Sequence, residues 1–146
     1  MKTYSAKPCD VDRKWYIIDA GQEPLGRVST RVAELLMGKG KPSFTKHIDT
    51  GDYVIVINSD SLVVTGKKLE DKIYYKHSKY PGGLTERKLK EKMSGDSREV
   101  IINAVRGMLP VNKLRPQRLQ RLKVYKGSEH DHDAQKPTVF NYKGSK

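Results

Sequence analysis

The chain has 146 residues and a mass of 16.6 kDa, which suits one compact domain with short extensions rather than two full domains. Lysine and arginine outnumber aspartate and glutamate by 29 to 17, which gives a formal net charge of +12 at pH 7. A chain with this excess repels itself unless a polyanion neutralises it, so nucleic acid is the expected partner and an acidic membrane surface the second candidate. Half of the excess lies in residues 111–146.

Cysteine content and hydropathy exclude several classes of protein. The single cysteine, Cys9, rules out an internal disulfide framework and every multi-cysteine zinc pattern. The longest apolar run, residues 54–57, is far shorter than the roughly 20 residues that span a bilayer, so we expect no membrane contact of that kind. No apolar stretch follows the first basic residues, so we expect no secretory signal and a cytoplasmic location.

Strand and helix patterns alternate through the first part of the chain. Residues 1–14 are polar and are predicted to form an N-terminal arm, and the aromatic and β-branched run at residues 15–18 is typical of a buried strand. Between Pro24 and Gly38, five apolar residues recur at helical spacing: Leu25, Val28, Val32, Leu35 and Leu36. Residues 53–57 are apolar without alternation, as expected for a strand of a parallel sheet that is covered on both faces.

The middle of the chain has weaker patterns. Residues 62–64 and 72–76 are predicted to form short strands with a turn at residues 66–67 between them. Residues 85–93 contain helix formers with several basic residues, which predicts a helix that faces mainly solvent.

The clearest helix follows Asp96, which can cap its first turn together with Glu99. Apolar residues at helical spacing continue until Pro110, where the helix is expected to end. A short basic helix is predicted at residues 115–122, followed by an extended segment at residues 123–125.

These elements predict an α/β fold with a small, mainly parallel sheet. We divide the chain into the N-terminal arm (1–14), a single α/β domain (15–126) that includes a basic block (113–126), and a polar C-terminal tail (127–146). The terminal segments are expected to be extended and basic.

Motifs for catalysis, nucleotides and metals are missing. Residues 19–25 lack both glycine-rich phosphate-loop patterns, and residues 38–41 follow a helix, so Gly38 is better explained as a helix C-cap before a basic loop. His130 and His132 alternate but lack the further ligands that a metal needs. Three aspartates flank the second predicted strand without evidence of a pocket that would tune their pKa values: Asp49, Asp52 and Asp60. We expect no enzymatic activity, no cofactor, no metal and no small-molecule substrate.

The basic block is the densest charged segment of the chain. It holds six basic residues and no acidic one: Lys113, Arg115, Arg118, Arg121, Lys123 and Lys126. On a helix, the three arginines spread over about a third of the circumference, while Leu119 and Leu122 point elsewhere. Guanidinium groups can donate two hydrogen bonds at once to phosphate oxygens. We therefore predict that this block contacts RNA or DNA.

Further basic clusters lie in predicted loops. The loop after the first helix contains Lys39, Lys41, Lys46 and His47, and a predicted turn contains Lys67 and Lys68. A third cluster interleaves Lys76, His77 and Lys79 with Tyr74, Tyr75 and Tyr80. This third pattern fits base stacking and an ordinary half-buried strand edge equally well. Several separated basic loops on a small domain favour a shaped, extended polyanion.

Several segments resemble the bacterial type of large-subunit ribosomal protein thirteen. They occur in the order KWYIIDA (14–20), LGR (25–27), HIDTGDYVIVIN (47–58), VTGKK (64–68), KIYY (72–75), GMLP (107–110), LKVYKG (122–127) and EHDHDAQKP (129–137). One departure follows GMLP, where Leu114, Arg115 and Pro116 replace the usual leucine, glycine and basic residue.

The resemblance implies a three-layer α/β/α domain around a four-stranded parallel sheet. It also implies a non-catalytic constituent of the large ribosomal subunit that binds large-subunit rRNA early in assembly and contacts neighbouring ribosomal proteins. Two other functions remain possible at this point, a free regulatory RNA-binding module and, less favoured, a small nucleotide-using α/β enzyme.

Overall fold

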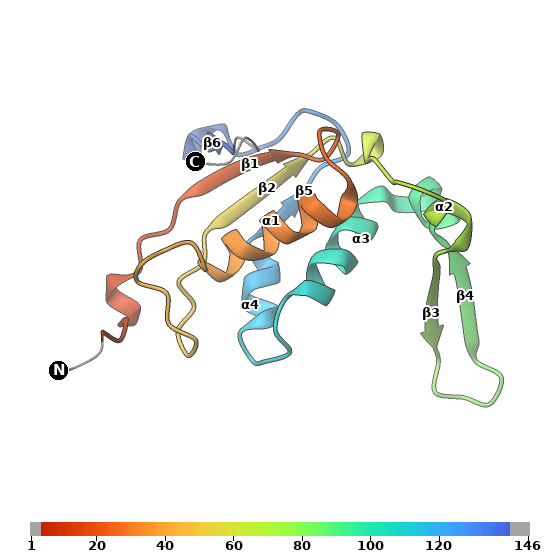
Figure 1. Ribbon diagram of the computed structural model, residues 1–146, viewed down its shortest axis with the longest axis horizontal. Coiled ribbons are helices and arrows are strands. Elements are labelled where there is room, and N and C mark those ends of the chain that lie inside the picture. Colours follow the sequence, from red (N-terminus) through yellow and green to blue (C-terminus); the bar gives the residue numbers. More distant parts are fainter. Residues whose placement is uncertain (1–3, 141–146) are drawn as a thin grey trace.

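The computed structural model describes residues 4–140 and contains a four-stranded sheet in which every strand runs parallel to its neighbours. Residues 1–3 of the predicted arm and residues 141–146 of the predicted tail lie outside the described residues. The strand order is β5-β2-β1-β6, with β1 at Trp15–Asp19, β2 at Tyr53–Ile57, β5 at Leu122–Val124 and β6 at Thr138–Val139 (Figure 1). The α/β class and the four-stranded parallel sheet are confirmed.

Helices α1 (Leu25–Met37) and α3 (Leu89–Met108) pack on one face of the sheet (Figure 1). Helix α1 ends as predicted at Gly38, whose left-handed backbone (φ 72°) lets its N–H donate to the carbonyl of Leu35. The core joins the inward residues of the strands to the apolar stripes of the two helices. It includes Ile18, Val28, Val32, Leu36, Val54, Val56, Val100, Ile101 and Val105.

Aromatic side chains cover the other face of the sheet. Trp15 and Tyr53 lie in register on neighbouring strands, and their rings stack with centroids 4.2 Å apart. The rings of Tyr125 and His132 complete this cluster, at 6.0 Å from each other. The third layer is therefore a C-terminal segment with a single 3-10 turn, Asp133–Gln135, packed beside the sheet.

A β-hairpin confirms the strand predicted at residues 72–76 and replaces the first part of the helix predicted at residues 85–93. Strand β3 (Ile73–His77) pairs antiparallel with β4 (Leu84–Lys88), so the prediction of a helix across residues 85–88 is wrong. Residues 62–64 do not form a strand either, since only Val63 makes an isolated bridge, to Pro24. The turn at residues 81–83 brings the two strands together, and Gly82 has the positive φ (73°) that such a turn favours.

Helix α3 joins two predicted helices across a kink at Asp96. The backbone of Asp96 is not helical (φ −148°, ψ 101°), and its carboxylate accepts the N–H of Arg98 at 3.1 Å. The predicted cap at Asp96 is confirmed, although Glu99 pairs with Lys92 at 3.2 Å instead of completing a capping box. The helix ends at Met108, ahead of Pro110, as expected.

The remaining elements are short. Helix α4 (Arg115–Gln120) confirms the predicted basic helix, and Pro116 occupies its first turn, where proline is tolerated. Helix α2 is at Lys68–Asp71, and 3-10 turns occur at Pro8–Asp10 and Ser59–Ser61. The predicted C-terminal tail contributes β6 to the sheet, so the sheet extends beyond the domain boundary drawn at residue 126.

Candidate nucleic-acid interface

A buried carboxylate organises the basic block. Asp49 receives two hydrogen bonds from Arg121, at 2.5 Å from Nη1 to Oδ2 and at 2.7 Å from Nη2 to Oδ1. Arg118 approaches Oδ1 of Asp49 with its Nε at 3.5 Å, and Arg121 also donates to the carbonyl of Leu36 at 3.1 Å. Only 2% of the Arg118 surface and 7% of the Arg121 surface are exposed.

This geometry corrects the prediction that Arg118 and Arg121 form a cationic outer face. Both point inward because Asp49, on the segment before β2, supplies the negative charge that lets guanidinium groups be buried. Burial alone would raise the pKa of Asp49, but the hydrogen bond and charge of Arg121 dominate and hold that pKa below its ordinary value. The N–H of Gly51 and the charge of Arg118 act in the same direction.

The loop that carries Asp49 is packed closely against helix α1. A Cβ atom built on Gly51 would lie 1.7 Å from the carbonyl oxygen of Leu36, so only glycine fits there without a shift of the backbone. Lys41 also stabilises this loop, because its Nζ donates hydrogen bonds to the carboxylate of Asp52 at 2.6 Å and to the carbonyl of Asp12 at 2.7 Å. Lys41 therefore performs a structural task in addition to the predicted contact.

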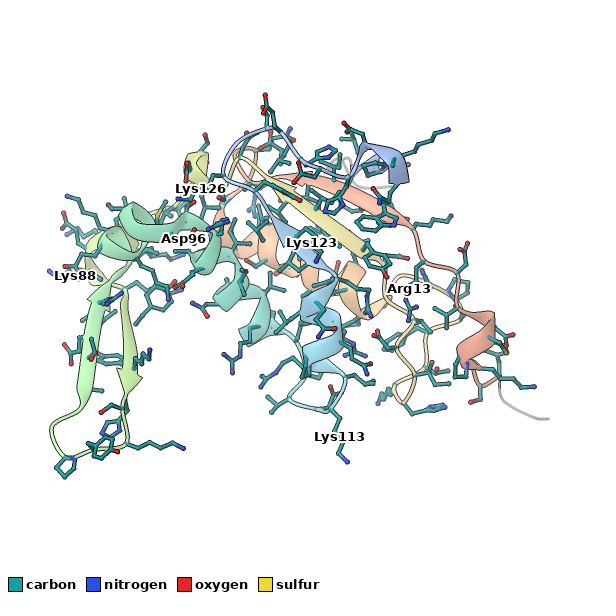
Figure 2. The ribbon with its side chains drawn as sticks, turned by 180° about the vertical axis from the view of Figure 1, so that it is seen from behind. Arg13, Lys88, Asp96, Lys113, Lys123 and Lys126 are labelled. Carbon is teal, nitrogen blue, oxygen red and sulfur yellow. The ribbon has the colours of Figure 1, made fainter. Side chains whose placement is uncertain are left out.

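The other predicted site residues lie at the surface. Eight of them are exposed: Lys39, Lys46, His47, Lys67, Lys68, Lys113, Lys123 and Lys126. Arg115 is half-buried, and the Nε2 atom of His47 lies 3.3 Å from the hydroxyl of Ser5. Figure 2 shows Lys113, Lys123 and Lys126 well separated, from the loop before α4 to the far end of β5. The block is thus contiguous in sequence but dispersed over the surface.

The remaining candidates for chemistry have structural partners. Asp52 pairs with Lys41, and Asp60 accepts a 2.5 Å hydrogen bond from the hydroxyl of Ser97. His130 lies 3.6 Å from Asp133. Within residues 4–140, no group of three or more histidine, cysteine, aspartate or glutamate side chains is arranged to hold a metal ion.

Sequence reasoning placed Lys76 in a basic cluster but missed three cations that lie around the same groove between the hairpin and helix α3, Arg87, Lys92 and Arg106. Lys76 and Arg87 lie on neighbouring strands of the hairpin, and Lys92 and Arg106 lie on the facing helix. A signal was present, because residues 81–83 read Pro-Gly-Gly between two short runs of strand-forming residues. Reading residues 85–93 as a helix hid that hairpin.

The family model described as "Ribosomal protein L13" matches residues 13–131. The chain belongs to the ribosomal protein L13 family. Proteins of this family are structural and non-enzymatic, so the expectation that the chain is not an enzyme is confirmed.

Individual members of the L13 family are similar over nearly the whole chain. A protein of Caldanaerobacter subterraneus subsp. tengcongensis is 55% identical over 137 residues, which cover 94% of this chain and 96% of the relative. Proteins of Listeria innocua and Geobacillus kaustophilus are 53% and 54% identical over 142 residues, which cover 97% of this chain and 98% of each relative. All three are named "Large ribosomal subunit protein uL13".

In this member of the L13 family, several resemblance motifs carry structural residues. The segment at residues 47–58 supplies Asp49, Gly51 and Asp52, which fix the loop before β2. The segment at residues 107–110 ends helix α3. None of the helices in the described part of the chain has the length and apolar character that crossing a membrane requires.

Proposed function

We propose that this protein is a structural constituent of the large ribosomal subunit in the cytoplasm, where it binds large-subunit rRNA. The observation that carries the proposal is the full-length similarity to relatives named as proteins of that subunit. The net charge of +12 and the eight exposed positions among the predicted site residues, seven lysines and His47, are consistent with a polyanionic partner.

The separation of the exposed lysines suits a folded RNA. An ammonium group acts as a compact point charge that neutralises phosphate without reading sequence. Cations on the loop after α1, on α2, before α4 and beyond β5 can reach phosphates of strands that approach from different directions. By neutralising them, the protein lowers the repulsion between those strands, which supports folding of the rRNA early in subunit assembly and contacts with neighbouring ribosomal proteins.

The dependence of rRNA binding on salt tests this proposal. If about eight cations contact phosphates, the logarithm of the association constant falls against the logarithm of salt concentration with a slope of roughly −6 to −7. The measurement is filter binding of the full chain to a large-subunit rRNA transcript at a series of salt concentrations. An affinity that does not depend on salt would contradict the proposal.

A pair of variants makes the test specific to the predicted residues. Substituting Lys67→Ala and Lys68→Ala together should reduce the magnitude of the slope by about 1.4 to 1.8, because two phosphate contacts are lost. The matched control, Lys67→Arg with Lys68→Arg, keeps both charges and should keep the slope. Equal slopes for the alanine and arginine pairs would remove α2 from the interface.

A free regulatory RNA-binding module would show the same salt dependence, so location must separate the two functions. We expect the protein to sediment with large subunits in a sucrose gradient at high salt. Recovery of the protein only at the top of the gradient would favour the regulatory module.

A further inference from the structure

A groove separates the β3–β4 hairpin from helix α3. The hairpin projects away from the body of the molecule at the end opposite the N-terminal arm (Figure 1). The groove has a volume of about 800 Å³, within the range of ligand-binding clefts. Of the basic clusters found in the sequence, only the third contributes to its lining, with Tyr74, Tyr75 and Lys76.

Alternate residues of a strand share one face, and on the face of the hairpin that lines the groove these residues are polar. Tyr74 and Lys76 of β3 lie in register with Arg87 and Thr85 of β4, and all four line the groove. The hydroxyl of Tyr74 is buried there and has no hydrogen-bond partner among the described residues.

The wall formed by helix α3 is also lined by charged and polar side chains. Lys92, Glu99 and Arg106 follow one another at intervals of seven residues, and Asn103 lies between the last two. Glu99 pairs with Lys92 at 3.2 Å, and the Nζ of Lys92 also lies 4.8 Å from the ring centroid of Tyr74. Glu99, the only carboxylate that lines the groove among residues 4–140, is thereby neutralised.

Three cations remain without a counterion. No carboxylate among residues 4–140 pairs with Lys76, Arg87 or Arg106, and all three are exposed. Arg87 and Arg106 come from opposite walls of the groove. Two guanidinium groups facing a polar cleft suit an anion whose oxygens can accept bonds from both sides, as a phosphodiester does.

Strand β3 is held by Tyr74, which packs on the hydrophobic core, whereas strand β4 has little to hold it in place. All five residues of β4 are exposed, and an isolated two-stranded hairpin is only marginally stable in water. A partner that occupies the groove would add contacts along the whole inner face of the hairpin.

We propose that this groove is a second RNA-binding site, which takes a single stretch of rRNA backbone between the hairpin and helix α3. This inference rests on the proposed function. Arg87 and Arg106 neutralise adjacent phosphates, Lys76 adds a third charge, and the side chains of Thr85 and Asn103 offer hydrogen bonds to ribose hydroxyl groups. An acidic protein segment is the competing occupant.

A matched pair of double variants tests the groove. Arg87→Ala with Arg106→Ala removes one cation from each wall, whereas Lys88→Ala with Lys90→Ala removes two exposed cations that do not line the groove. Filter binding to the large-subunit rRNA transcript should be about tenfold weaker for the first pair, with a slope reduced in magnitude by about 1.4 to 1.8. The control pair should bind within about twofold of the unsubstituted chain.

The outcomes separate the groove from the proposed function. If the unsubstituted chain binds rRNA with a steep salt dependence and the two pairs bind alike, the groove proposal is overturned while the proposed function stands. If the unsubstituted chain does not bind rRNA, both are overturned. Thermal unfolding of each variant ensures that only folded proteins are compared.

Cross-linking gives a second reading that does not depend on variants. With a transcript containing 4-thiouridine, we expect mass spectrometry to find nucleotide adducts on peptides that contain Tyr74 or Arg106. Adducts confined to other parts of the chain would contradict RNA as the occupant of the groove. Binding of an acidic peptide, and not of RNA, in the groove would contradict it as well.

Discussion

Asp49 stabilises two guanidinium groups that water would otherwise hydrate. A buried ion pair contributes little beyond a well-packed apolar alternative, yet removing one partner leaves an uncompensated buried charge. Here the carboxylate serves both Arg118 and Arg121, so its removal would strand two cations in the protein interior.

The substitution Asp49→Asn should therefore lower the free energy of unfolding by about 3 to 5 kcal/mol, the usual effect of breaking a buried pair. The measurement is urea-induced unfolding followed by circular dichroism. Asp133→Asn is the matched control, since its side chain is 93% exposed and the change should stay within about 0.5 kcal/mol. Equal stabilities of the two variants would contradict the structural role of Asp49.

The same carboxylate predicts a dependence on pH. Its pKa in the folded protein lies below the ordinary value of 3.8, so its ionised form stabilises the folded state above that pH. The difference in unfolding free energy between the unsubstituted chain and Asp49→Asn should be constant from pH 7 to about pH 5. It should then shrink as the pH falls below 3.8, because protonation removes the advantage. If this difference in unfolding free energy grew on acidification, the pKa of Asp49 would be raised in the folded protein and not lowered.

At the scale of elements, the kink in α3 turns one long helix into two shorter ones. Asp96 leaves the helical conformation and its carboxylate caps the second segment at the N–H of Arg98. The hydroxyl of Ser97, the next residue, is buried and hydrogen-bonds to both Ser59 and Asp60 in the 3-10 turn that follows β2. The kink therefore ties the helix to the carboxyl edge of the sheet.

Replacing the cap tests that arrangement. Asp96→Ala should lower the free energy of unfolding by about 1 kcal/mol, the typical cost of losing an N-cap side chain. Asp96→Asn keeps an oxygen that can accept the same bond and should recover most of the loss, as measured by thermal unfolding at low ionic strength. If the asparagine variant were as unstable as the alanine variant, the ion pair with Arg98 would matter more than the cap.

At the scale of the whole molecule, the C-terminal segment completes the sheet. Strand β6 pairs with Tyr16 and Ile17, so β1 becomes an inner strand with hydrogen bonds on both sides. The N–H of Phe140 donates to the carbonyl of Ile17 at 2.9 Å, and its ring meets that of Tyr16 edge-on.

The ring of Phe140 is the main apolar contact of this segment with the core. Phe140→Ala should lower the free energy of unfolding by about 1 to 3 kcal/mol, somewhat less than the loss of a fully buried ring. Its neighbour Val139 is 70% exposed, so Val139→Ala should change stability by no more than about 0.5 kcal/mol in the same urea titration. Similar effects of the two substitutions would show that the segment does not pack on the core.

Local patterns in the sequence determined the central elements. The apolar run at residues 53–57, the helical spacing between Pro24 and Gly38, and the cap at Asp96 each depend on residues close together in the chain. Such short-range preferences can be read directly, and they were enough to predict a parallel α/β sheet. The family resemblance predicted the number of strands.

Tertiary structure alone decided where the charges point. Arg118 and Arg121 look like solvent-facing cations in the sequence, because their partner Asp49 lies about 70 residues away and only the fold brings the two segments together. Arg87 and Arg106 are likewise brought together only by the fold, because they line opposite walls of one groove. Charge composition thus predicts a polyanionic partner, whereas the tertiary structure decides which cations are exposed and which are buried in ion pairs.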